Sequence, residues 1–248
     1  MRNVLVVTGG AGFIGSNLIS ELLQFKKFKI ISIDNYSSGL IKNHINNKKV
    51  KYLTGETKTI EILLKNYISK IHSIFHFGEF ARIYQSFKKI NECFSSNIEG
   101  TSNVFNFALK NKIRLIYSAT SASLGNKGQD MNLSPYAFSK AKNLELLENL
   151  KKWFKFRYEV IYFYNVYGAK QICKGDMATV VGIFEDHFKS KKKLPVVRPG
   201  TQLRRFTHVL DTVKACIFAW IQNKCKHYSI AAKQSYSIID LEIGGAHV

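Results

Sequence analysis

The order of apolar and polar residues along the first two thirds of the chain restricts its fold more than any other feature. Short runs rich in Val, Ile, Phe and Tyr alternate with longer segments whose apolar residues recur at helical spacing. This alternation predicts βαβ units, and therefore an α/β fold built on a parallel sheet. The expected strands are residues 4–8, 29–34, 50–53, 73–77, 114–118 and 160–164, and the expected helices are residues 15–25, 59–68, 92–110 and 136–153.

The pattern becomes less regular after Gly168. A helix is expected over residues 177–189, a strand over residues 195–198 and a helix over residues 210–223, with basic and polar residues between them. We therefore predict two parts, a sheet domain over residues 1–168 and a smaller region over residues 169–248.

A glycine-rich turn follows the first expected strand and opens the first expected helix. Gly9 permits a tight turn, Gly12 lets backbone amides approach a pyrophosphate, and Gly15 lets the helix pack closely on the strand. The second expected strand ends at Asp34, 19 residues after Gly15, where a carboxylate can accept hydrogen bonds from both ribose hydroxyls of an adenosine. The two features together predict a dinucleotide site. Because Asp34 would repel a 2′-phosphate, the site favours NAD over NADP.

Three side chains form a candidate catalytic group. Tyr136 and Lys140 are four residues apart at the start of an expected helix, which places the phenol and the ammonium on one face. Thr120 follows the expected strand 114–118, so its hydroxyl would enter the same crevice at the carboxyl edge of the sheet. A lysine cation beside a phenol stabilises phenolate and lowers the tyrosine pKa from about 10 toward neutrality. Tyr136 is therefore a candidate general base for a hydroxyl group.

Seven segments, taken in order, resemble the extended short-chain dehydrogenase/reductases, and within them the NAD-dependent sugar-nucleotide epimerase/dehydratase family that includes UDP-glucose 4-epimerases. These segments are TGGAGFIGS at 8–16, DNYSSG at 34–39, HFG at 76–78, NIEGT at 97–101, SPYAFSK at 134–140, NVYG at 165–168 and RRFTHV at 204–209. The resemblance implies a Rossmann-type, doubly wound parallel sheet over residues 1–168. It also implies a truncated substrate-binding region over residues 169–248, because full-length relatives continue further than this chain.

The resemblance also assigns residues to the cofactor and to the substrate. The residues that it implies for NAD are Gly9, Gly12, Phe13, Ile14, Gly15, Asp34, Asn35, Ser38, Gly39, Glu56, Thr57, Phe77, Gly78, Asn97, Tyr136 and Lys140. Among these, Glu56 would contact the adenine, and Asn97 would support the region of the catalytic lysine. The residues that it implies for a nucleotide sugar are Glu79, Arg82, Thr120, Asn165 and Arg204.

One of these substrate assignments has a further argument, and two have an alternative. Arg204 suits a diphosphate because a guanidinium binds phosphate oxygens bidentately. A salt bridge in solvent or at the start of a helix is the alternative for Glu79 and Arg82. His76 is expected to be a structural histidine with satisfied hydrogen bonds, since Tyr136 already supplies the base.

The two residues after Thr120 separate the reactions of this family. Its dehydratases carry Asp-Glu there and its decarboxylases carry Glu at the second position, whereas this chain has Ser121 and Ala122. Neither side chain can perform the proton transfers of an elimination. The resemblance thus favours an NAD-dependent epimerase, an isomerase that oxidises a nucleotide sugar to a 4-keto intermediate and reduces it on the other face, in polysaccharide biosynthesis. The alternatives are a 4,6-dehydratase and a non-catalytic dinucleotide- or RNA-binding protein on the same fold.

Charge and cysteine content bear on partners and location. The formal charge of +20 comes from 37 basic and 17 acidic residues, but the basic residues form small scattered clusters, so nucleic acid is not the expected partner. The four cysteines form no Cys-x-x-Cys pair, and we expect no metal site. With no long apolar run and no signal peptide, a cytoplasmic location is expected. The family pairs two helices in its dimers, here residues 92–110 and 136–153, which implies a homodimer.

Overall fold

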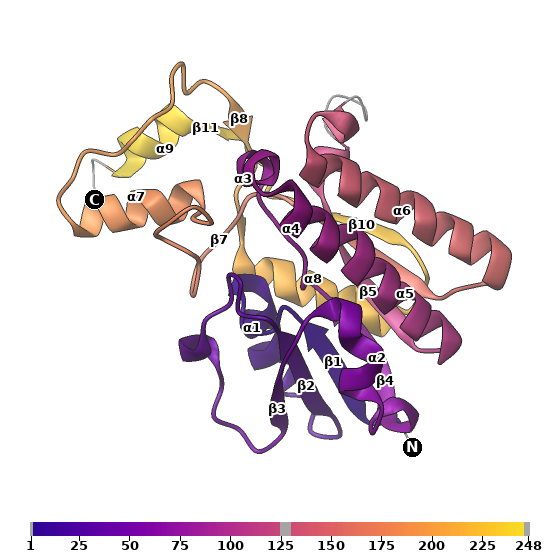
Figure 1. Ribbon diagram of the computed structural model, residues 1–248. Coiled ribbons are helices and arrows are strands. Elements are labelled where there is room, and N and C mark those ends of the chain that lie inside the picture. The colour runs from indigo at the N-terminus through magenta and orange to yellow at the C-terminus, as the bar shows by residue number, and fades with distance from the viewer. Residues whose placement is uncertain (1, 125–129, 246–248) are drawn as a thin grey trace.

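The computed structural model describes residues 2–124 and 130–245. A seven-stranded sheet lies at the centre, in the order β10-β6-β5-β4-β1-β2-β3, and all neighbouring strands are parallel (Figure 1). Its strands are β1 (Val4–Thr8), β2 (Lys29–Asp34), β3 (Val50–Thr54), β4 (Ile71–His76), β5 (Arg114–Thr120), β6 (Tyr158–Phe163) and β10 (His227–Ile230). Because β2 and β4 pair with opposite sides of β1, the winding direction reverses there, and such a reversal opens a crevice at the carboxyl ends of the strands. The expected doubly wound parallel sheet is confirmed.

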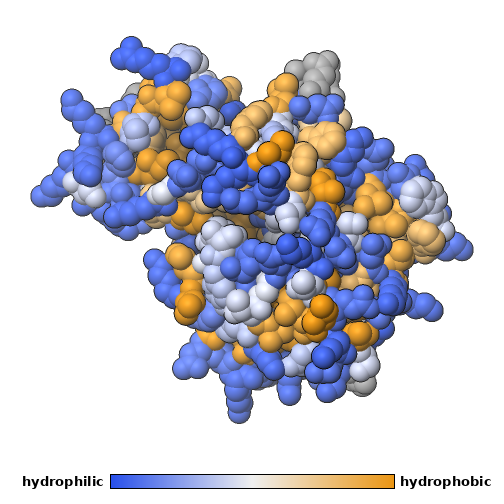
Figure 2. Space-filling view, viewed as in Figure 1, coloured by the Kyte–Doolittle hydropathy of each residue, from blue (hydrophilic) through white to orange (hydrophobic). Residues whose placement is uncertain are grey.

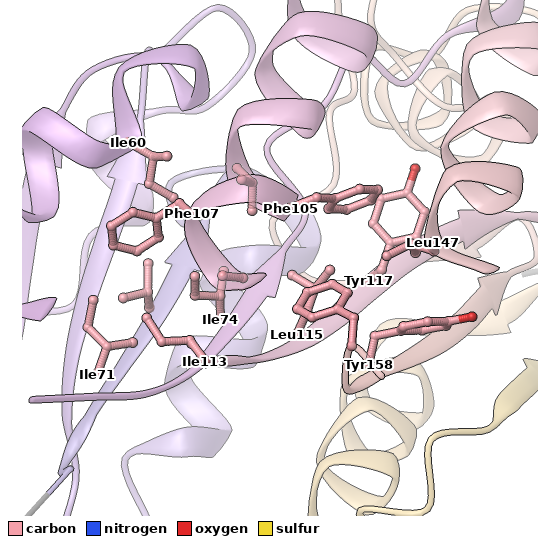
Figure 3. Packing of buried hydrophobic residues seen from close by; sticks show 14 of the residues in the cluster. Ile60, Ile71, Ile74, Phe105, Phe107, Ile113, Leu115, Tyr117, Leu147 and Tyr158 are labelled. Carbon is pink, nitrogen blue, oxygen red and sulfur yellow. The ribbon is translucent and has the colours of Figure 1, made fainter. Parts of the chain in front are cut away.

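Helices cover both faces of this sheet. One face carries α2 (Ile60–Leu64), α5 (Thr101–Lys110) and α6 (Pro135–Phe154), and the other carries α1 (Phe13–Leu22) and α8 (Val209–Gln222). In the first of the two cores, the ring of Tyr117 on β5 lies 5.4 Å from that of Phe105 on α5, centroid to centroid, with Leu147 of α6 close by (Figure 3). All five residues of β1 are buried, as a continuous apolar run predicts for a strand covered on both faces.

The expected helix over residues 92–110 is divided into three parts. After α4 (Ile90–Phe94) the chain forms a π-helical turn, η4 (Ser95–Gly100), and then continues as α5. In this turn the backbone carbonyl of Asn97 accepts a hydrogen bond from the Asn143 side chain of α6, at 2.7 Å. A π turn widens the helix by one residue and is frequent near functional sites. The other short elements of this part are η1 (Ile41–Asn43), η2 (Thr57–Thr59), η3 (Ile68–Lys70), α3 (Ile83–Lys88) and η5 (Ser121–Ser123).

The predicted boundary at residue 168 needs a correction, because the chain returns to the sheet after it. Helix α8 buries Val209, Val213 and Trp220 against the sheet, and the Trp220 indole donates to Ser73 Oγ at 3.0 Å. Strand β10 then adds to the free edge of β6. The amphipathic pattern of α8 correctly predicted a helix, but periodicity does not say which sheet face a helix covers.

The remainder of the predicted second region lies apart from the sheet in Figure 1. It consists of α7 (Val180–Lys189), α9 (Ile238–Gly245) and a small sheet of β8 (Leu203–Arg204) with β11 (Tyr236–Ser237), while β7 (Val166–Tyr167), just before the predicted boundary, pairs with β9 (Thr207–His208). Residues 195–198 form no strand, which corrects the sequence expectation: Val197 is 80% exposed and has no neighbouring strand. None of the helices in the described ranges is long and apolar enough to cross a membrane.

Candidate active site

A cavity of about 1580 Å³ lies at the carboxyl edge of the sheet. Its walls come from the loops that follow β1 to β6 and from the region around α7 and β8. In space-filling view the molecule is indented between that region and the sheet body (Figure 2). The cavity therefore occupies the crevice that the reversal of strand order predicts.

The glycine turn after β1 forms one wall of the cavity. Gly9 has φ +70°, and a Cβ built on Gly15 would lie 2.1 Å from the Gly9 carbonyl oxygen, so α1 packs directly on the turn. A Cβ on Gly12 would meet only that same oxygen, at 3.1 Å, and would otherwise project into open space. Gly12 is also the N-cap of α1, so the positive end of the helix faces the crevice. This cradle fits a pyrophosphate.

Asp34 ends β2 next to this turn. Its carboxylate accepts hydrogen bonds from the backbone amides of Ala11 and Tyr36, both at 2.9 Å, which fix it at the cavity wall. Each carboxylate oxygen keeps a second lone pair, as contact with ribose hydroxyls requires. Gly39 does not line the cavity: it packs on Asp34, where a Cβ would lie 2.7 Å from the carboxylate oxygen. Gly39 thus supports Asp34 from behind.

Most of the other residues expected at the cofactor also meet in this cavity. Its lining includes Phe13, Ile14, Asn35, Ser38, Glu56, Thr57, Phe77 and Gly78. Glu56 is exposed and pairs with Lys58 at 2.7 Å. Asn97 lies outside the lining and is fully buried, and its side chain donates to the Phe80 carbonyl and to Ser139 Oγ, while its oxygen accepts from the Phe80 amide. It therefore holds the loop after β4 to helix α6 beside Lys140.

The three candidate catalytic residues come together at the far end of the cradle. Helix α6 starts at Ser134, whose hydroxyl accepts from the Ala137 amide at 3.0 Å, with Pro135 in the first helical position. Tyr136 is held at this start by a backbone hydrogen bond to Ser86 Oγ at 3.2 Å. Its phenol shares a hydrogen bond with the hydroxyl of Thr120, and Thr120, Tyr136 and Lys140 all line the cavity.

The electrostatic surroundings of Tyr136 differ from the sequence expectation. Burial raises the pKa of Tyr136 to about 12, the charge of Glu79 acts in the same direction, and the Thr120 hydrogen bond and Arg82 oppose them. Lys140 was expected to lower this pKa, but its ammonium is bound to the Glu79 carboxylate and to the Ser118 carbonyl. The buried Glu79 carboxylate therefore balances the charge of Lys140.

Glu79 and Arg82 were expected either at the substrate or in a salt bridge. The Glu79 side chain is 3% exposed and forms a buried salt bridge with Lys140, and Glu79 also lines the cavity. Arg82 lines the cavity and donates from Nε and Nη2 to the Met177 carbonyl, which ties the sheet body to the segment before α7.

The two residues expected at the nucleotide lie on the opposite wall. Asn165 has φ +36°, is exposed, and donates to the Arg205 carbonyl at 3.3 Å. Arg204 on β8 is exposed, and its Nη1 donates to the carbonyl of its neighbour Leu203 at 3.1 Å. Both residues line the cavity, so Arg204 presents a guanidinium to any anion there.

Several positioning residues were missed by the sequence reasoning. Ser86 holds the start of α6, Asn143 donates to Glu79 and to the Asn97 carbonyl, and Met177 receives Arg82. Asn143 is three residues after Lys140, at a spacing that places both on one helix face, and this was the signal available. The described residues contain no group of three or more His, Cys, Asp and Glu side chains that could hold a metal ion.

Comparisons with known proteins find similar sequences and a similar fold. The chain is 29% identical over 224 residues to an ADP-L-glycero-D-manno-heptose-6-epimerase of Brachyspira hyodysenteriae, covering 85% of this chain and 70% of the relative. It is 29% identical over 238 residues to a UDP-N-acetyl-alpha-D-glucosaminuronate decarboxylase of Bacillus cytotoxicus, covering 88% of this chain and 71% of the relative. The crystal structure of Thermotoga maritima UDP-glucose 4-epimerase with UDP-glucose superposes with a TM-score of 0.88 at 22% identity, covering 98% of this chain and 82% of that one.

The family model that matches the chain is the NAD dependent epimerase/dehydratase family, and it covers residues 5–231. This segment contains the glycine turn, Asp34 and the Thr120, Tyr136 and Lys140 cluster, together with all but the first residue of the seven-stranded sheet. The chain therefore belongs to the NAD dependent epimerase/dehydratase family.

Proposed function

We propose that the protein is an NAD-dependent epimerase that inverts a hydroxyl-bearing carbon of a nucleotide-activated hexose through a keto sugar. The observation that carries the proposal is the continuity of one cavity, which has the glycine cradle and Asp34 at one end and Thr120, Tyr136 and Lys140 at the other. A dinucleotide bound along the cradle would extend toward the phenol. The cavity also reaches Asn165 and Arg204, which supports a nucleotide sugar as the second ligand.

The chain supplies the proton chemistry of this proposal. Tyr136 accepts the proton of a sugar hydroxyl, while the Thr120 hydroxyl, hydrogen-bonded to the phenol, orients both groups. NAD, when bound at the glycine turn and Asp34, would supply both the hydride acceptor and the hydride donor, so the reaction would involve no net redox change. On the return step the same phenol gives its proton back to the sugar oxygen, and inversion requires only that the sugar presents its other face.

Epimerisation is favoured over water loss by the residues after Thr120. A dehydratase needs an acid and a base beside the substrate carbon to remove a hydroxyl group. Ser121 and Ala122 follow Thr120 in this chain, and neither side chain can serve as an acid or a base at neutral pH. The end of the cavity at Thr120, Tyr136 and Lys140 thus supports oxidation and reduction without elimination.

The decisive experiment incubates the purified protein with NAD⁺ and a panel of UDP-, GDP-, ADP- and dTDP-hexoses, with products followed by NMR and mass spectrometry. We expect an isomer of unchanged mass, and loss of its formation in Tyr136→Phe. A product lighter by one water would identify a dehydratase instead. NAD binding without turnover on any sugar would contradict the proposal and favour a non-catalytic dinucleotide-binding protein.

We also propose that the protein is a homodimer that pairs α5 and α6 with the same helices of a second copy. Three aromatic side chains on α6, Phe138, Trp153 and Phe154, are exposed in the single chain, at 37%, 63% and 60%. Burial of such rings is a main source of interface stability. Light scattering coupled to size exclusion would give twice the monomer mass of 28.3 kDa, and Trp153→Glu would lower it.

A further inference from the structure

Glu79 lies where its charge acts on Tyr136, the proposed base. It follows β4 by three residues, and its carboxylate lies in the interior among strand β5 and helices α5 and α6. Oε2 accepts from the Lys140 ammonium. Oε1 accepts from the Thr101 and Tyr117 hydroxyls, both at 3.0 Å, and from Asn143 Nδ2 at 3.3 Å. Four donors thus converge on one buried carboxyl group.

The Lys140 ammonium is fixed by this carboxylate and by two weaker contacts. It donates to the Ser118 carbonyl, and it lies 4.5 Å from the centroid of the Tyr117 ring. Its side chain is 4% exposed, so water does not screen the pair. Because Glu79 balances the lysine charge, Tyr136 one helical turn earlier does not experience an uncompensated cation.

The other titratable groups around Tyr136 and Lys140 come from four elements. Arg82, before α3, carries a positive charge and is bound to the Met177 carbonyl. Burial lowers the pKa of His76 on β4 to about 4, so its ring is neutral. Burial also raises the pKa of Cys93 on α4 and of Tyr117 on β5, so both are uncharged. Among these groups, Glu79 thus carries the negative charge.

We propose that Glu79 is a positioning residue that holds the Lys140 ammonium in place and, through its charge, moves the action of Tyr136 as a base to higher pH. The proposal rests on the proposed function only in naming Tyr136 as the base. The electrostatic relationship itself concerns groups of this chain and exists without cofactor or substrate.

The test is the tyrosinate absorbance titration of Glu79→Gln, followed over the pH range in which circular dichroism shows a folded chain. Subtracting the titration of the same chain with Tyr136→Phe isolates Tyr136 from the other tyrosines. We expect the midpoint of Tyr136 to fall by about one pH unit or more, because the negative charge of Glu79, which raises the pKa of Tyr136, is gone. An unchanged or higher midpoint would overturn the proposal.

Tyr117→Phe is the matched control, since it removes one donor to the same carboxylate and keeps both the charge and the ring. Its Tyr136 midpoint should not fall. A fall equal to that of Glu79→Gln would mean that local packing, rather than charge, sets the titration, and the proposal would be wrong.

A second comparison avoids a lone buried cation, which could unfold the single variant. Lys140→Met leaves Glu79 without its partner, whereas Glu79→Gln combined with Lys140→Met has neither charge. We expect the Tyr136 midpoint to be higher in Lys140→Met than in the double variant, and equal midpoints would refute the role of Glu79.

In the NAD-loaded enzyme, the acidic limb of the pH profile of turnover should shift to lower pH in Glu79→Gln. If the titrations are as expected but no variant shows turnover, the result would count against the proposed epimerase function and would still support the role of Glu79.

Discussion

Thr8 and His76 are 68 residues apart in the sequence, and Thr8 Oγ1 donates to His76 Nδ1 across 2.7 Å at the carboxyl ends of β1 and β4. This hydrogen bond is part of a chain of hydrogen bonds in which each donor and acceptor is determined. The Thr8 oxygen accepts from the amides of Phe77 and Gly78, while His76 Nε2 donates to Thr101 Oγ1 at 2.9 Å, and Thr101 donates to Glu79. The donors and acceptors are consistent only with a neutral imidazole protonated at Nε2. His76 is therefore structural, as the sequence predicted, and links the dinucleotide turn to the ion pair of Glu79.

The neutral state of His76 predicts a pH-dependent stability. Burial lowers its pKa from 6.5 to about 4, so below pH 6.5 the unfolded chain takes up a proton that the folded chain does not. This contribution to stability is complete above pH 6.5 and decreases by about 3 kcal/mol as the pH falls toward 4. Urea unfolding of the chain and of His76→Gln, whose amide does not titrate, should show a smaller loss of stability for the variant over that range. Parallel pH curves for the two proteins would disagree with the prediction.

The close packing of the glycine turn predicts a large effect for Gly15→Ala. The added Cβ would lie 2.1 Å from the Gly9 carbonyl oxygen and 2.9 Å from Gly10 Cα, both backbone atoms that cannot rotate away. We expect a loss of about 2 kcal/mol in unfolding free energy and much weaker NAD binding by calorimetry. Ser20→Ala, at an exposed site of the same helix, should change stability by less than about 0.5 kcal/mol. A Gly15→Ala protein that binds NAD normally would contradict the packing argument.

Arg204→Ala tests the nucleotide end of the cavity. Its guanidinium is exposed, so removal should leave the melting temperature unchanged. Loss of a charged hydrogen bond to phosphate should raise KM for the nucleotide sugar about 10- to 100-fold with little change in kcat. Arg157→Ala is the control of equal charge, since Arg157 donates to Asn223 in the loops at the amino edge of the sheet, and its KM should match that of the unaltered enzyme. Equal KM values for both variants would show that Arg204 does not contact the phosphate.

Glu159→Gln should detach the last strand of the sheet. The Glu159 carboxylate is fully buried and accepts from Arg114 at 3.1 Å and from the amides of Cys225 and Lys226 at 2.9 and 2.8 Å, directly before β10. A glutamine turns an NH₂ group toward one of these donors and leaves Arg114 without its counter-ion, so we expect a loss of about 3 kcal/mol or more.

Hydrogen exchange should locate the resulting loss of protection at residues 227–230. Glu145→Gln is the matched control, because Glu145 pairs with Lys142 at the surface, where an ion pair contributes less than about 1 kcal/mol. A stability loss spread evenly over the sheet would argue against a specific anchor for β10.

The sequence predicted those parts of the fold that local pattern determines. Strands β1 and β2 have the predicted bounds, because apolar runs buried on both faces stand out from their neighbours. The strand predicted at 195–198 was wrong, because a strand needs a partner strand and distant parts of the chain decide the pairing. The π turn at 95–100 was also missed, because the bond that it permits comes from Asn143, more than 40 residues later.

The candidate site was predictable to a similar degree. Spacing placed Tyr136 and Lys140 on one helix face and Thr120 at the strand end, and these residues do share one cavity. The ion pair of Lys140 with Glu79 could not be selected from the sequence, where Glu79 had two open alternatives. Its position depends on how the loop after β4 is held by Asn97, which is a tertiary contact.

The late return of the chain to its own sheet has a consequence for biosynthesis. Leu5, Val7 and Phe75 belong to strands made early, yet the helix that covers them beside α1 spans residues 209–222. During translation this face of the sheet lacks α8 until more than 130 residues after β4 have been added. A nascent chain released before Val209 would expose this apolar face to other molecules, so ribosome-bound intermediates of this protein are natural clients for a chaperone.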